Sequence, residues 1–122
     1  MKIAITAKDS SLESDVDPRF GRCSHFLIVD LDTMNFELIS NESAMASGGA
    51  GIQAAQAVAK TGVEALLTGN IGPNAFQTLS AAGIKVFTGA SGTIKEAVEK
   101  YKKGELNETE APNVGSHSGM RR

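Results

Sequence analysis

Short apolar segments alternate with glycine-rich and polar loops along the chain, and their spacing predicts five strands and three helices. The expected strands are short runs bounded by turn residues, at 3–6, 24–30, 36–40, 63–67 and 84–88. The expected helices carry apolar residues at helical spacing, at 50–60, 73–82 and 93–103. Pro73 suits the first position of the second helix, because its missing N–H would have no partner there.

The order of these elements predicts an α/β fold with three layers. Residues 31–35 are few enough to form a hairpin, so the strands on either side of them should be antiparallel. Strands and helices alternate in the second half, which favours parallel strands with right-handed crossovers. We therefore expect a mixed five-stranded sheet in the order 3-2-1-4-5, with one antiparallel strand and the first strand central. Such a sheet resembles the ribonuclease H-like motif.

Composition narrows the class of protein. The 122 residues suit one domain, which we place at 1–103 and expect to be followed by a mobile polar tail at 104–122. A formal charge of −2 gives no reason to expect nucleic-acid binding, and no apolar run approaches the ~20 residues that span a bilayer. We expect a cytoplasmic protein, as a monomer or weak dimer, with no intrachain disulfide because there is one cysteine.

Three glycine-rich loops, at 47–51, 68–72 and 88–92, each precede a predicted helix. Free N–H groups and the helix dipole make such a helix start attractive to anions, and the loops should meet at the carboxyl edge of the sheet. The alternative is that the glycines only form turns and caps. The candidate ligand-binding residues in these loops are Gly49, Gly51, Gly69, Asn70, Gly72, Asn74, Ser91 and Gly92.

The segment 17–23, DPRFGRC, is a second candidate. Arg19 and Arg22 offer planar donors for carboxylates or other oxyanions, and a neighbouring cation would favour the thiolate of Cys23 as a soft-metal ligand. The alternatives are that both arginines pair with Asp15 or Asp17, and that Cys23 is a small buried residue.

No catalytic constellation is visible in the sequence. The G-x-x-x-x-G-K-[ST] pattern is absent, and the first strand offers no carboxylate for a metal-dependent nuclease. A binding module is therefore the leading hypothesis. The alternatives are an enzyme acting on a phosphorylated or nucleic-acid substrate and a protein-interaction domain in metal-cluster assembly.

Three motifs in the same order resemble the dinitrogenase iron-molybdenum cofactor-binding family. They are DPRFGRC at 17–23 with Phe26, GAGIQAA at 49–55 and GNIGPNA at 69–75. The resemblance implies a ribonuclease H-like fold over about residues 1–103 and places this chain among the small stand-alone members. It also implies a non-catalytic carrier or sensor of an anionic iron-sulfur or iron-molybdenum-type cluster, with a cluster-assembly protein as a partner. Cys23 is the metal ligand that the motif positions suggest.

Overall fold

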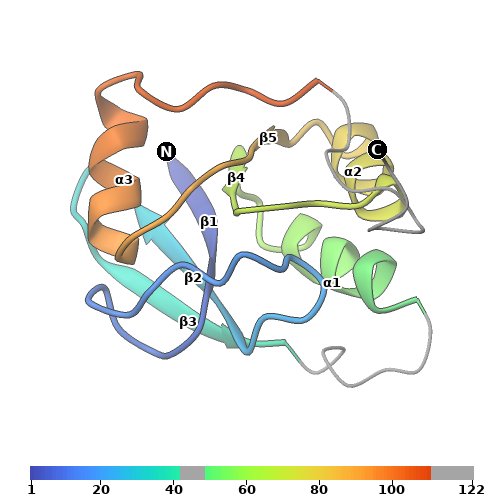
Figure 1. The fold of residues 1–122 in the computed structure, drawn as a ribbon, viewed down its shortest axis with the longest axis horizontal. Helices are drawn as coiled ribbons and strands as arrows, with labels where there is room; N and C mark the ends of the chain where they lie inside the picture. The colour runs from blue at the N-terminus through green and yellow to red at the C-terminus, as the bar shows by residue number, and fades with distance from the viewer. Residues whose placement is uncertain (42–48, 111–122) are drawn as a thin grey trace.

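The computed structural model describes residues 1–41 and 49–110 of the chain. The central strand of its sheet is β1 (Lys2–Ala7), and the strand order is β3-β2-β1-β4-β5, as predicted (Figure 1). Strand β2 is antiparallel to both β1 and β3, whereas β4 and β5 continue the sheet in parallel from β1. The other elements are β2 (His25–Asp30), β3 (Phe36–Ser40), α1 (Ala50–Ala59), β4 (Ala65–Leu67), α2 (Pro73–Ala81), β5 (Lys85–Phe87) and α3 (Ile94–Lys102).

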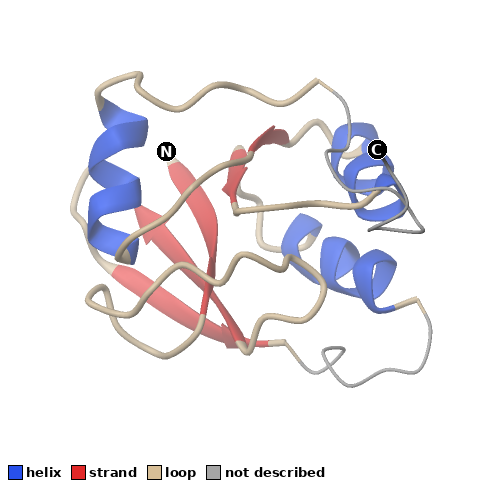
Figure 2. Ribbon diagram, in the orientation of Figure 1, coloured by secondary structure: helices blue, strands red, loops and turns tan. Residues whose placement is uncertain are grey.

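Helices cover both faces of the sheet and divide the core in two (Figure 2). Alternate residues of a strand point to opposite faces, so Ala4 and Leu66 join the core under α1 and α2. Ile3 and Ile5 join the other core, which α3 covers. This three-layer arrangement confirms the predicted fold class. None of the helices in the described ranges is long and apolar enough to cross a membrane.

A buried polar network fixes the chain at the carboxyl end of β1. The Thr6 hydroxyl donates to the backbone carbonyl of Asp17 at 2.7 Å, and the Asp17 N–H donates to the Thr6 carbonyl at 2.9 Å. The Thr68 hydroxyl, just after β4, lies 2.9 Å from that of Thr6. All three residues are buried, so hydrogen bonding offsets the penalty of removing them from water. The segment that follows Asp17 is thereby held against the ends of two neighbouring strands.

The chain after α3 contacts the rest of the fold beyond residue 103, the predicted end of the domain, through residues 106–109. Glu108 forms a bridge with Phe87 on β5, and the Thr109 N–H donates to the Val86 carbonyl at 2.7 Å. Leu106 packs against the core under α3. Backbone pairing by Glu108 and Thr109 thus covers part of the outer edge of β5. Residues 111–122 lie outside the described part, and the prediction of a mobile tail stays a prediction there.

Gly69 is required because the backbone of another segment lies against it. A Cβ atom at this position would lie 2.7 Å from the Cα and 2.9 Å from the Cβ of Pro18, distances that real Cβ atoms do not show. Gly51, in the first turn of α1, differs: a Cβ there would meet the Ala75 Cβ at 3.5 Å, an ordinary contact.

We therefore expect Gly69→Ala to lower the free energy of unfolding by about 2 kcal/mol, because the segment at Pro18 must move away. Gly51→Ala is the matched control and should leave stability unchanged or raise it by up to about 1 kcal/mol, since alanine favours the helix. Urea denaturation of the two variants measures both effects. Equal stability losses would show that the contact with Pro18 can relax.

Candidate functional site

A cleft of about 760 Å³ opens where α1 and α2 begin. Three segments line it: residues 19–22, 49–52 and 70–75. They include seven of the predicted site residues, which the sequence places far apart: Arg19, Arg22, Gly49, Gly51, Asn70, Gly72 and Asn74. Of the first glycine loop, residues 47 and 48 lie outside the described part of the chain. Gly69 is not among the lining residues and instead packs against the backbone of Pro18.

The two helix starts at the cleft carry no side-chain cap within the described residues. Gly49 adopts a left-handed conformation (φ 72°) before α1, and an extended Gly72 precedes Pro73 at the first position of α2. Neither first turn contains an acidic residue. Their backbone N–H groups and the positive ends of both helix dipoles therefore remain available to an anion in the cleft.

The third glycine loop does not join this cleft, which corrects the expectation that all three loops meet. Ser91 and Gly92 line a separate hollow beside α3, on the other face of the sheet. The start of α3 is also fully capped. Thr93 and Glu96 form a capping box. The N–H groups of Ile94 and Lys95 donate to backbone carbonyls of the loop after β1, at 2.8 and 2.9 Å.

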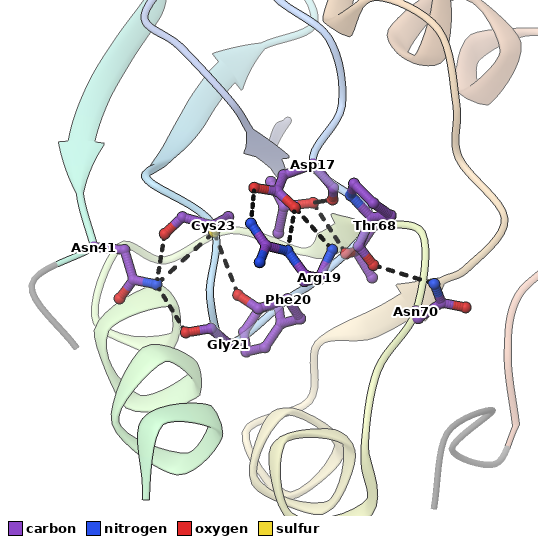
Figure 3. A network of polar contacts seen from close by, with 10 residues as sticks. Asp17, Arg19, Phe20, Gly21, Cys23, Asn41, Thr68 and Asn70 are labelled. Atoms are coloured by element: carbon purple, nitrogen blue, oxygen red, sulfur yellow. Dashed lines mark hydrogen bonds and ion pairs between the residues drawn. The ribbon is translucent and has the colours of Figure 1, made fainter. Parts of the chain in front are cut away.

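Arg19 lines the cleft and is paired with Asp17, which is not among the lining residues. Figure 3 shows the contacts between the two side chains. The Asp17 carboxylate accepts the Arg19 backbone N–H at 2.9 Å, Nε at 3.3 Å and Nη2 at 3.5 Å. The Asp17 side chain is 3% exposed and that of Arg19 is 66% exposed. Arg19 can therefore pair with Asp17 and also donate to an anion in the cleft. A guanidinium has five N–H donors, and the ion pair with Asp17 occupies only two of them.

The remaining polar side chains of the cleft are Arg22, Asn70 and Asn74. The backbone N–H and side-chain amide of Asn70 both donate to the Pro18 carbonyl, at 2.8 and 3.3 Å, so this residue also secures the segment 17–23. Asn74 is exposed in the first turn of α2. No aspartate or glutamate is among the described residues that line the cleft, which include two arginines. The carboxylate paired with Arg19, that of Asp17, lies outside this lining.

Cys23 is a core residue and not part of the cleft lining. Its side chain is fully buried, and the thiol donates to the Phe20 carbonyl at 3.3 Å. The side-chain amide of Asn41 secures it by donating to its carbonyl at 2.9 Å (Figure 3). Burial, assisted by the charge of Asp17, raises the pKa of Cys23 from 9.0 to about 12. Because the thiol is buried, protonated and outside the cleft lining, the structure favours the alternative of a small buried residue.

Protein side chains suited to metal coordination do not gather anywhere in the described residues. No group of three or more histidine, cysteine, aspartate or glutamate side chains that could hold a metal ion occurs there. The described cleft lining instead supplies backbone N–H groups, two arginines and apolar atoms from residues such as Phe20, Ile52 and Pro73. The cleft can thus hold an anion, but its described lining offers no side chain of the kinds that usually coordinate metals.

Residues 1–104 match the family described as dinitrogenase iron-molybdenum cofactor. The chain belongs to this family. An uncharacterized protein of Methanocaldococcus jannaschii is 33% identical over 113 residues, which are 90% of this chain and 92% of the relative.

Two solved structures are similar to the chain over most of its length. The apo form of the orange protein from Desulfovibrio gigas is 46% identical, with a TM-score of 0.90 over 92% of this chain and 95% of that one. A Thermotoga protein provisionally described as NifB, of the DUF35 family, is 39% identical, with a TM-score of 0.77 over 88% and 91% of the two chains.

Asp17 is the residue whose importance the sequence left open. In the sequence it is one of two alternative partners for the arginines, and its hydrogen bonds with Thr6 are tertiary contacts. A local signal was nevertheless present, because an aspartate carboxylate often accepts the backbone N–H of the residue two positions later. Asp17 accepts the Arg19 N–H in this way. Its burial behind the cleft was not readable from the sequence.

The raised pKa of Cys23 predicts a loss of stability in alkali. The unfolded thiol releases its proton near its ordinary pKa of 9.0, but the folded thiol keeps it up to about 12. The unfolded state therefore binds fewer protons in this window, and the stabilising contribution, complete below pH 9, declines as the pH rises. Between about pH 8 and about pH 10 the free energy of unfolding should fall by about 1 kcal/mol more in the natural protein than in Cys23→Ala. Identical pH profiles from urea denaturation would contradict the raised pKa.

Proposed function

We propose that this protein is a non-catalytic carrier or sensor of a preassembled, anionic metal–sulfur cofactor of the iron–sulfur or iron–molybdenum type. One observation carries the proposal: two uncapped helix starts and two arginines line one cleft, with no carboxylate among its described lining residues. Each feature favours negative charge, and together they come from three separate segments of the chain.

The chemistry of the described lining indicates how the cofactor is held. Arginine, asparagine and backbone N–H groups donate hydrogen bonds, which suit the sulfide and organic-acid ligands at the surface of such a cofactor. The lining lacks cysteine, histidine and carboxylate side chains in its described part, so the metals would keep the ligands with which they arrive. The cofactor is accordingly a cargo bound as an intact anion.

The size and mixed character of the cleft agree with a cargo larger than a single phosphate. A volume of about 760 Å³ lies within the range of ordinary small-molecule sites. Apolar atoms of Phe20, Ile52 and Pro73 are part of its lining. Such surfaces suit polarizable sulfur better than strongly hydrated oxygen.

The comparisons support the same class of function. The family is that of the dinitrogenase iron-molybdenum cofactor, and one of the similar structures is provisionally described as a NifB protein. The proposed cofactor-binding residues are those that line the cleft or shape it: Arg19, Arg22, Gly49, Gly51, Gly69, Asn70, Gly72 and Asn74. We further propose that a cluster-assembly protein delivers or receives the cargo.

A pair of isosteric substitutions on α2 tests the charge preference of the cleft. Asn74→Asp adds a negative charge to the first turn of α2, whereas Gln77→Glu adds the same charge at an exposed position outside the cleft lining. In an anaerobic titration with extracted iron–molybdenum cofactor, Asn74→Asp should weaken binding on the order of fivefold to tenfold. Gln77→Glu should change it by less than about twofold, because the dipole effect is confined to the first turn.

Gel filtration supplies the direct readout for the same titration. The natural protein should elute with about one equivalent of bound cofactor and its visible absorbance, as a carrier with one cleft requires. A colourless protein would contradict the carrier function. Equal weakening by both substitutions would contradict the assignment to this cleft.

A further inference from the structure

Asp17 is buried and is not among the residues that line the cleft, so a bound ligand would interact with its charge without contacting it. Its carboxylate faces Arg19 and is almost fully buried, whereas the arginine is largely exposed (Figure 3). The carboxylate accepts Nε at 3.3 Å and Nη2 at 3.5 Å, so one edge of the guanidinium is already engaged. The charge of Arg19 is thus largely compensated before any ligand arrives.

The surroundings of Asp17 make it a fixed counter-charge. Its backbone N–H and carbonyl both bond to Thr6 on the central strand, at 2.9 and 2.7 Å. The Arg19 backbone N–H also donates to its carboxylate at 2.9 Å, so that oxygen stays bonded even if the guanidinium turns toward a guest. Asp17 therefore stays in place during binding.

A compensated arginine changes which anions the cleft can hold. A compact oxyanion is strongly hydrated, and only strong opposing charge repays the removal of its water. A charge-diffuse anion is less hydrated and gains more from hydrogen bonds and apolar contacts. Beside its two arginines, of which Arg19 is paired with Asp17, the described lining supplies backbone N–H groups, amide donors and apolar atoms.

We infer that Asp17 is a specificity-determining residue, which makes the cleft prefer charge-diffuse, sulfur-rich anions over compact oxyanions of the same charge. This inference rests on the proposed function, in which the cleft binds an anion. It adds the reason for selectivity: Asp17 compensates Arg19 from behind and does not contact the ligand.

Tetrathiomolybdate and molybdate provide a matched pair of probes, because both are tetrahedral dianions that differ in having sulfur or oxygen at the surface. Equilibrium dialysis of each anion against the natural protein should show tighter binding of tetrathiomolybdate, by on the order of tenfold. Asp17→Asn keeps the shape of the side chain and removes its charge. In this variant, molybdate should bind on the order of tenfold more tightly and tetrathiomolybdate much less so, which reduces the preference.

Asp15→Asn is the control for net charge. Asp15 is exposed, lies two residues earlier and does not line the cleft, so its substitution removes the same charge without touching Arg19. The preference of this variant should equal that of the natural protein. An equal change in both variants would show a general charge effect and overturn the inference.

Arg19→Gln gives an independent measurement in case Asp17→Asn does not fold. This substitution alters an exposed side chain and leaves the buried carboxylate uncompensated. Molybdate binding should then weaken more than tetrathiomolybdate binding, so the preference should rise. An unchanged preference in both Asp17→Asn and Arg19→Gln would overturn the role of Asp17. Failure of the natural protein to bind either anion would count against the proposed function itself.

Discussion

Close backbone packing of the segment 17–23 on the glycine loops before α1 and α2 is the constraint on which the cleft depends. Pro18 lies where a Cβ of Gly69 would be, and a Cβ on Gly21 would lie 3.2 Å from the Gly51 Cα. Any side chain at these positions would separate the segment from the helix starts. The cleft exists because three stretches of backbone approach closely enough to place arginines beside open N–H groups.

The two faces of the sheet treat their helix starts in opposite ways. On one face, carbonyls of the loop after β1 accept the first N–H groups of α3, and the capping box provides acceptors for the remaining ones. On the other face, α1 and α2 begin at glycines without a described side-chain cap. Leaving orphan N–H groups at two neighbouring helix ends weakens both helices slightly. That is a reasonable arrangement where a ligand supplies the missing acceptors.

Several strand directions were predictable because they follow from local rules. A short connection makes β2 and β3 antiparallel, and the alternation of strands and helices after residue 50 makes β4 and β5 parallel. Five of the cleft residues were also predictable, since glycine and asparagine around a helix start mark its open end, and the two arginines followed from their donor chemistry. The prediction that the third glycine loop joins the cleft was wrong, because the sequence pattern of residues 88–92 does not reveal which face of the sheet α3 covers. Cys23 could be assigned to the core only from its burial, which the sequence around a single cysteine does not indicate.

The described lining lacks metal-coordinating side chains, which favours transient carriage of the proposed cofactor over its permanent binding. A cluster bound through thiolates or imidazoles must exchange ligands before it can leave, and such bonds are strong. A cluster bound through N–H groups and arginines leaves when those hydrogen bonds and screened charges are replaced by water or by a partner. Asp17 reduces the charge attraction further by compensating Arg19. A cleft with moderate attraction, and with no metal-coordinating side chain in its described lining, is therefore better suited to transfer of a cofactor than to permanent storage.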